Sequence, residues 1–190
     1  LKEITKPKNL KKFKFKTFPL LMGILNVTPD SFSDGGKYLK SNSANKQIKK
    51  LKKDGAEIID IGGESTRPNS LTIDSLDEWN RVKSKLKYAK KNRMFISLDT
   101  RKSFVLNKSL PLKINLLNDV SGLSHDYKMI NILKESKIPF ILHHMQGTPK
   151  TMQKNPKYDN VLLDIYDYFE KKLKLIRENK IKHNNIILDP

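Results

Sequence analysis

Cysteine is absent from this chain of 190 residues, which excludes disulfides and thiolate metal ligands. No apolar run approaches the length of a membrane span. No segment has the basic start, apolar middle and small-residue cleavage site of a secretory signal. The sequence therefore predicts a soluble, cytoplasmic protein that does not associate with a membrane.

Arginine is scarce although the chain is strongly basic. Lysine and arginine together number 38 against 20 acidic residues, a formal net charge of +18, but only five of these bases are arginine. Proteins that bind nucleic acids favour arginine because its planar fork makes paired bonds to bases and phosphates. The lysines also lack interleaved aromatic residues on which bases could stack. The composition favours a solvated lysine surface and no nucleic-acid partner, with a positive field that attracts anionic substrates.

Short apolar runs alternate with segments of helical period. The runs are residues 20–25, 58–61, 94–98, 114–117, 140–142 and 186–188. Two helical faces are predicted between them, one with Leu76, Trp79, Val82, Leu86 and Ala89, the other with Ile165, Phe169, Leu173 and Ile176. Ser75 is the predicted N-cap of the first helix, with Glu78 as its capping-box partner. Repeated strand–helix units predict a parallel sheet with right-handed crossovers.

Two α/β architectures fit this alternation, an open doubly wound sheet and a closed (β/α)8 barrel. Polar residues follow every apolar run, namely Asn26, Gly62 with Gly63, Asp99, Asn118 with Asp119, His143 with His144, and Asp189. An open sheet concentrates such residues near one switch point, whereas a barrel collects them from successive strands on one rim. We therefore predict a (β/α)8 TIM barrel. Such barrels take roughly 250 residues, so we expect about six of the eight βα units here.

The chain is predicted to form one domain over residues 1–190. Residues 1–19, in which lysine alternates with phenylalanine, predict a strand or hairpin that caps the bottom of the barrel. The first residue is Leu1 rather than methionine, and Pro190 comes directly after an apolar run. We therefore expect a fragment of a longer protein, truncated at its C-terminus.

The most informative segment is residues 22–36, which read Met-Gly-Ile-Leu-Asn-Val-Thr-Pro-Asp-Ser-Phe-Ser-Asp-Gly-Gly. A buried strand ends at Asn26 and opens into a long loop. A structural turn needs the glycines, but it does not need Phe32, Ser33 and Asp34 together, so the loop is predicted to be functional. Asn26 either ties down this loop or offers an amide oxygen to Mg²⁺, and the residues alone leave both roles open.

A second signature, residues 60–68, reads Asp-Ile-Gly-Gly-Glu-Ser-Thr-Arg-Pro. Thr66 and Arg67 place a hydroxyl beside a guanidinium after a strand, which is a good anion clamp. Asp99 and Asn118 close the next two strands, where such residues either cap the following helix or bind a ligand with a paired donor edge.

Adjacent histidines follow the fifth apolar run, but they do not indicate zinc. Neighbouring strand residues point to opposite faces, and no third ligand has matching spacing. We expect one of His143 and His144 to pack in the wall and the other to face the pocket.

The segments 22–36 and 60–68 resemble the signatures of dihydropteroate synthases, folate-pathway enzymes that join a pterin to p-aminobenzoate. The resemblance implies that Asn26 binds Mg²⁺ and that Phe32, Ser33 and Asp34 fold over the site. It implies that Ser65, Thr66, Arg67 and Pro68 contact p-aminobenzoate and diphosphate. It also implies that Asp99, Asn118, Met145 and Asp189 bind the pterin.

The implied reaction condenses 6-hydroxymethyl-7,8-dihydropterin diphosphate with p-aminobenzoate to give 7,8-dihydropteroate and diphosphate. The catalytic set would be Asn26, Phe32, Ser33, Asp34 and Arg67. Both substrates are small molecules, Mg²⁺ is the cofactor, and the full-length protein is expected to be a homodimer. The family also uses a Ser-Arg-Lys segment and an Arg-x-His pair near the end of its barrel. Neither follows Asp189 here, so we expect negligible activity from the 190 residues alone.

Two alternatives remain at this point. A methyltransferase that uses methyltetrahydrofolate would share pterin contacts such as Asn118, but it has no need of the loop with Phe32 or of Thr66, Arg67 and Pro68. A basic, non-catalytic nucleic-acid-binding protein is the alternative from a different class.

Overall fold

The computed structural model describes residues 19–28, 37–65, 72–147 and 156–190, and it describes residues 37–42 by their backbone alone. Strands and helices alternate along these ranges. In chain order they are β1 (Met22–Asn26), α1 (Lys37–Lys53), β2 (Ile58–Gly62), α2 (Ser75–Lys91), β3 (Phe95–Asp99), α3 (Ser103–Ser109), the 3-10 helix η3 (Leu110–Leu112), β4 (Leu116–Asp119), α4 (Lys128–Ser136), β5 (Phe140–His143), α5 (Val161–Glu178), the 3-10 helix η4 (His183–Asn185) and β6 (Ile186–Asp189). All six predicted strands are present, each within two residues of its predicted start.

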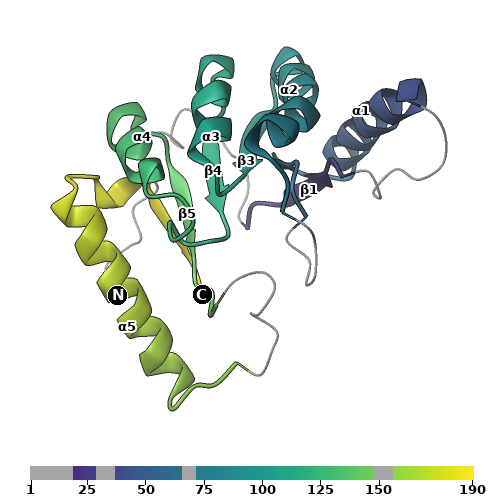
Figure 1. Ribbon diagram of the computed structural model, residues 1–190. Helices are drawn as coiled ribbons and strands as arrows, with labels where there is room; N and C mark the ends of the chain where they lie inside the picture. The colour runs from purple at the N-terminus through teal and green to yellow at the C-terminus, as the bar shows by residue number, and fades with distance from the viewer. Residues whose placement is uncertain (1–18, 29–36, 66–71, 148–155) are drawn as a thin grey trace.

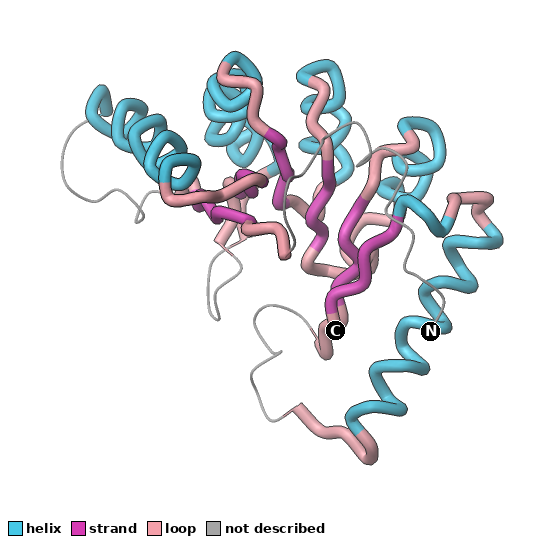
Figure 2. Tube along the Cα trace, turned by 180° about the vertical axis from the view of Figure 1, so that it is seen from behind, coloured by secondary structure: helices cyan, strands magenta, loops and turns pink. Residues whose placement is uncertain are grey.

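The six strands form one parallel sheet in the order β1-β2-β3-β4-β5-β6. Each strand pairs with the next strand along the chain. The sheet curves, and the helices lie along the outside of the curve (Figures 1 and 2). A doubly wound sheet would reverse its strand order at a switch point. Sequential order with an outer layer of helices is the wall of a (β/α)8 barrel, and the predicted incomplete barrel is confirmed.

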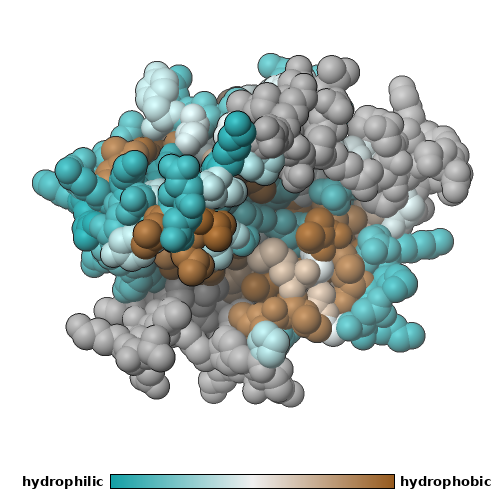
Figure 3. Space-filling view, turned by 90° about the horizontal axis from the view of Figure 1, so that it is seen from below, coloured by the Kyte–Doolittle hydropathy of each residue, from teal (hydrophilic) through white to brown (hydrophobic). Residues whose placement is uncertain are grey.

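Alternate residues of each strand pack on the two faces of the sheet. The outer face packs against the helices in the main core, which includes Leu25, Ile59, Ile61, Ile96, Leu98, Leu117, Phe140 and Leu142. The inner face carries a separate apolar cluster of Ile58, Phe95, Leu116 and Ile141, against which Leu20, Met22 and Ile187 pack. In the view from below, apolar residues gather near the middle of the molecule with hydrophilic residues to either side (Figure 3). The inner cluster fills the lower part of the barrel, so the upper part is left for polar groups.

The start of α2 differs from the prediction by one residue. Asp74, not Ser75, is the N-cap, with extended backbone (φ −65°, ψ 152°) and a carboxylate that accepts the Leu76 N–H at 2.7 Å. Glu78 does not close a capping box, because its side chain is buried and bonded to Thr100 and Lys102. The capping prediction was therefore wrong in both residues.

The predicted apolar helix faces are largely confirmed. Val82, Leu86 and Ala89 are buried on α2, as are Phe169 and Ile176 on α5. Leu76 is the exception, since 54% of it is exposed in the first turn of α2. None of the described helices is long and apolar enough to cross a membrane.

Candidate active site

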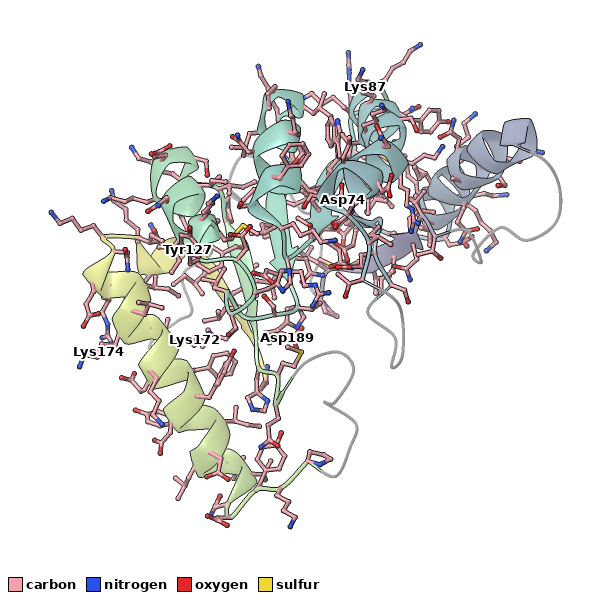
Figure 4. The ribbon with its side chains drawn as sticks, viewed as in Figure 1. Asp74, Lys87, Tyr127, Lys172, Lys174 and Asp189 are labelled. Carbon is pink, nitrogen blue, oxygen red and sulfur yellow. The ribbon has the colours of Figure 1, made fainter. Side chains whose placement is uncertain are left out.

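The inner face of the sheet changes from apolar to polar toward the carboxyl ends of the strands. Residues paired in register share a face, so Asp60 lies beside Ser97, Asp99 beside Asn118, and His143 beside Asp189. The inward polar residues are Asn26, Asp60, Ser97, Asp99, Asn118, His143 and Asp189. Figure 4 shows Asp189 at the end where β6 finishes, and Lys87 on the opposite side of the molecule, on α2. All six strands thus deliver polar side chains to one concave region.

Four of these side chains form a continuous polar contact across the sheet, which we call the inner polar chain: Asp60, Asn118, His143 and Asp189. Asn118 Nδ2 donates to Asp60 Oδ2 at 3.0 Å. Asn118 Oδ1 lies 2.5 Å from His143 Nε2. His143 Nδ1 lies 3.1 Å from Asp189 Oδ2. The inner polar chain links β2, β4, β5 and β6 and orients the groups that face the pocket.

Two buried atoms beside the inner polar chain have no hydrogen-bond partner among the described residues. They are Asp60 Oδ1 and Ser97 Oγ, and both residues are almost fully buried. Burial raises the pKa of Asp60, and Ser97, Asn118 and the charge of His143 offset only part of this effect. A buried polar atom without a partner destabilises a fold by about 1–3 kcal/mol. Unmet acceptors on the inner face are therefore places where the donors of a ligand would bind favourably.

Asp99 occupies space that exists because residue 62 is glycine. A Cβ atom placed on Gly62 would lie 2.8 Å from Asp99 Oδ2. Burial raises the pKa of Asp99 well above its ordinary range, and the negative charges of Asp60, Glu78 and Asp119 raise it further. A ligand that donates two parallel N–H bonds would favour the ionised form of this carboxyl.

A second buried polar group lies where β2 and β3 continue into their loops. We call it the rim ion-pair network: Glu64, Glu78, Thr100, Arg101 and Lys102. Lys102 Nζ lies 2.7 Å from Glu78 Oε2 and 3.1 Å from Glu64 Oε1. Arg101 Nε contacts Glu64 Oε2 at 2.9 Å, and Thr100 Oγ1 donates to Glu78 Oε1 at 2.5 Å. Each carboxylate of the network thus has at least two donors.

The rim ion-pair network holds both ends of the loop after β2. Glu64 stands just before residues 66–71, and its Oε1 accepts the N–H of Ile73 just after them at 3.1 Å. Lys102 Nζ donates to the Ile73 carbonyl at 2.8 Å. Burial alone raises the pKa of Glu64, but the bonds from Arg101 and Ile73 and the charge of Lys102 outweigh it and lower the pKa. The network therefore ties Glu64 to Ile73, the described residues on either side of residues 66–71.

Asn26 is exposed at the end of β1, in register with Gly62. Its amide oxygen is a hard ligand of the kind Mg²⁺ takes singly or in pairs, together with waters and substrate phosphate. Among the described residues, no cluster of three or more His, Asp or Glu side chains is arranged to hold a metal. A single amide oxygen is compatible with an ion that takes its other ligands from water and substrate, and the role of Asn26 as a magnesium ligand stays a prediction.

Residues 22–190 match the family of pterin binding enzymes. This chain belongs to the pterin-binding enzymes. It is 39% identical to the dihydropteroate synthase of Haemophilus influenzae over 173 residues, covering 90% of this chain and 62% of that relative. The resemblance noted in the sequence is confirmed.

Solved structures of dihydropteroate synthases share this pterin-binding fold. The Clostridium difficile enzyme in the presence of pteroic acid has a TM-score of 0.83 at 36% identity, covering 94% of this chain and 66% of that one. The Xanthomonas albilineans enzyme with 4-aminobenzoic acid has a TM-score of 0.81 at 30% identity, covering 90% of this chain and 61% of that one. This pterin-binding chain thus spans about three fifths of the length of the relatives it matches.

Of the site residues predicted from the sequence, the structure describes Asn26, Ser65, Asp99, Asn118, Met145 and Asp189. Asn26, Asp99, Asn118 and Asp189 lie on the inner face, at or near the carboxyl ends of their strands. Met145 is half-buried, two residues after β5. The remaining predicted site residues lie outside the described residues; they are Phe32, Ser33, Asp34, Thr66, Arg67 and Pro68. Residues 1–18 of the predicted N-terminal cap also lie outside them. Their roles stay predictions.

The sequence did not single out Asp60, Ser97 or the rim ion-pair network as parts of the site. An aspartate inside the otherwise apolar run 58–61 was the available signal for Asp60. The two adjacent histidines point to opposite faces of the sheet, as predicted. His143 joins the inner polar chain, whereas the ring of His144 packs edge-on against Tyr168 at 4.9 Å between centroids.

Proposed function

We propose that the full-length protein, of which we expect these 190 residues to be a part, catalyses the dihydropteroate synthase reaction. The substrates would be 6-hydroxymethyl-7,8-dihydropterin diphosphate and p-aminobenzoate, and the products 7,8-dihydropteroate and diphosphate. The observation that carries this proposal is the convergence of the buried Asp99 and Asn118 and the exposed Asp189 on one polar face that has an unmet acceptor in Asp60. The similarity to dihydropteroate synthases along 90% of the chain supports it.

The chemistry of the inner face suits a flat, nitrogen-rich ring. A pterin carries a 2-amino group next to an N3–H, and a carboxylate such as that of Asp99 accepts both side by side. Asn118 and Asp189 would hold another edge of the ring. Because Asp99 and Asn118 are buried, a ring without matching donors and acceptors would leave them unpaired and bind far more weakly.

The proposed reaction breaks the C–O bond between the pterin methylene and the diphosphate and forms a C–N bond to the amine of p-aminobenzoate, which loses a proton. Catalysis then consists of holding the two substrates in line and of stabilising the departing diphosphate. Arg67 would bind the diphosphate, and Phe32 and Pro68 would hold the aromatic ring, with Ser33, Asp34 and Thr66 beside them. Mg²⁺ bound with Asn26 would neutralise charge on the leaving group.

The proposal is tested by diphosphate release from the pterin substrate on the full chain, with and without p-aminobenzoate. Release is expected only when both substrates are present. Asp99→Asn is expected to lower kcat/KM at least tenfold, because a charged hydrogen-bond partner contributes about 1.5–3 kcal/mol. Lys87→Ala, on the exposed outer side of α2, is the control. Methyl transfer from methyltetrahydrofolate without diphosphate release would replace this proposal by the methyltransferase alternative.

Three further expectations go with the proposal. A homodimer, a cytoplasmic location and the dependence on Mg²⁺ stay predictions. Gel filtration of the full chain tests the first, and omission of Mg²⁺ from the assay tests the last.

A further inference from the structure

His143 is the one member of the inner polar chain that contacts two of the proposed pterin-binding residues. Its ring nitrogens lie 2.5 Å from Asn118 Oδ1 and 3.1 Å from Asp189 Oδ2. The side chain is 20% exposed, so one part of the ring is fixed in the wall and another part borders the pocket. A histidine in this place connects Asn118 to Asp189 across β4, β5 and β6.

The contact with Asn118 determines which way the asparagine amide points. An amide oxygen only accepts hydrogen bonds, so His143 Nε2 must carry the proton. Asn118 Nδ2 uses one of its two N–H bonds on Asp60 Oδ2 at 3.0 Å. Its oxygen already accepts from His143 through one of its two lone pairs, so the donor that Asn118 has left for a ligand is the second N–H. If the Asn118 amide were turned over, its oxygen would face Asp60 Oδ2. Two oxygens attract each other only through a shared proton, so the Asp60 carboxyl would have to be protonated.

Polar and charged groups surround His143 from the inner face and from α5. The Asp189 carboxylate lies 3.1 Å from its Nδ1. Burial raises the pKa of Asp60 and of Asp119, and the positive charge of His143 opposes both shifts. From α5, the Tyr168 hydroxyl donates to the His143 carbonyl at 2.9 Å and stays neutral, because burial and Asp119 raise its pKa to about 12.

We propose that His143 is a specificity-determining positioning residue, which holds the Asn118 amide so that it presents a hydrogen-bond donor to the ligand. This inference rests on the proposed function, since it assigns the pterin to this pocket. It follows that the edge of the heterocycle next to Asn118 is a hydrogen-bond acceptor. Asp189, aligned by the other nitrogen of His143, offers its second oxygen to a donor of the ligand.

The first test compares His143→Leu with His143→Gln in the full chain. Leucine removes the donor to Asn118, whereas the glutamine amide can still supply one. We expect His143→Leu to weaken binding of 6-hydroxymethylpterin about tenfold or more, and His143→Gln to stay within about threefold of the wild type. The KM for p-aminobenzoate should not change in either variant. His183→Leu, at an exposed histidine in η4, is the matched control.

The second test inverts the polarity of Asn118 while keeping its bond to Asp60. In the double variant Asp60→Asn/Asn118→Asp, the amide and the carboxylate exchange places, so the ligand meets an acceptor in place of a donor. The melting temperature should stay close to that of the wild type, while binding of 6-hydroxymethylpterin falls tenfold or more. Equal or tighter binding by this variant would overturn the proposal.

The outcomes separate this inference from the proposed function. If the wild type binds the pterin but releases no diphosphate, the proposed function fails and binding alone decides the role of His143. Equal binding by the wild type and His143→Leu would overturn the inference, whatever the assay of turnover shows. An equal loss in both His143 variants, accompanied by a higher KM for p-aminobenzoate, would indicate a merely structural histidine and would also overturn it. Absence of pterin binding by the wild type would overturn both.

Discussion

The rim ion-pair network and the inner polar chain lie at the same end of the barrel, yet their hydrogen bonding is complete to different degrees. In the rim ion-pair network, Glu78 is fully buried and receives donors from Lys102 and Thr100. In the inner polar chain, Asp60 is almost as deeply buried, but one of its oxygens has no partner among the described residues. Both groups consist mainly of polar residues from the strands and the loops that follow them, and Glu78 of α2 completes the rim ion-pair network.

This difference separates a structural role from a binding role. Buried polar groups in folded proteins are nearly always paired, because an unpaired one destabilises the fold. A network that is already paired has nothing left to offer a ligand, and it serves to hold the loop between Glu64 and Ile73. A chain with an unpaired acceptor has a binding capacity that the protein itself does not use. The four predictions below test this contrast.

The largest effect is expected from Lys102→Ala. Removal of the cation leaves Glu78 and Glu64 buried without their central partner, and breaking a buried pair in this way typically destabilises by about 3–5 kcal/mol. Urea unfolding of the full chain measures the change. Lys50→Ala is the control, because the Lys50–Asp54 pair is 67% and 50% exposed and should contribute less than about 1 kcal/mol. Similar losses in the two variants would contradict a structural role for the rim ion-pair network.

Gly62→Ala should weaken both folding and binding. The new methyl group would lie 2.8 Å from Asp99 Oδ2, so the carboxylate has to move. We expect a loss of about 1–3 kcal/mol in stability from overpacking, and a loss of about tenfold or more in pterin affinity. Calorimetric titration with 6-hydroxymethylpterin measures the second effect. In an Asp99→Ala background the same substitution should cause no further loss of stability, because the clashing group is gone.

Stability should respond to pH in opposite ways at Glu64 of the rim ion-pair network and at Asp99, which is paired in register with Asn118 of the inner polar chain. Glu64 has a lowered pKa, so its contribution is present above its ordinary value of 4.5 and disappears as the pH falls through the folded-state pKa. Asp99 has a raised pKa, so it destabilises the fold as the pH rises from its ordinary value of 3.8 toward the folded-state pKa. Glu64→Gln should therefore be less stable than the wild type at pH 7 and approach it in acid.

Asp99→Asn should show the reverse trend, gaining stability relative to the wild type as the pH rises. Urea unfolding of the two variants and the wild type between pH 3 and pH 7 tests both signs. Parallel curves for the two variants would mean that the two regions do not differ in this respect.

The smallest effect is expected from Ser97→Ala. The Ser97 hydroxyl is buried without a partner among the described residues, so its removal should leave stability unchanged or raise it by up to about 1 kcal/mol. Ser109→Ala is a matched control, because the equally buried Ser109 hydroxyl donates to the carbonyls of Val105 and Leu106. That control should lose about 0.5–1.5 kcal/mol. A comparable loss at Ser97 would show that its hydroxyl is paired in the free protein.

Strand positions were predictable from the sequence because each buried strand is a short apolar run that ends in a polar residue. The same endings located Asp99, Asn118 and Asp189, since parallel strands of a barrel finish on one rim. The N-cap of α2 was less certain, because Asp74 and Ser75 are both capping residues and the choice between them depends on backbone geometry.

The bonds of the inner polar chain could not be predicted in the same way. Asn118 pairs with Asp60, 58 residues earlier, and with His143, 25 residues later. Such pairs depend on the register of the strands, which a single sequence does not determine. The rim ion-pair network is similar, since Lys102 looks like one more surface lysine until the loops of β2 and β3 are folded against each other.

Tyr168 contacts the backbone of β5 from outside the barrel. Its hydroxyl bonds to the His143 carbonyl and lies against Gly122, where an added Cβ would come within 2.1 Å of the hydroxyl oxygen. The φ of Gly122 is +57°, a further reason for glycine there. Tyr168 and Gly122 therefore fix the backbone at the end of β5, the segment that carries the His143 side chain. A residue on an outer helix thus helps to hold a residue of the inner face in place.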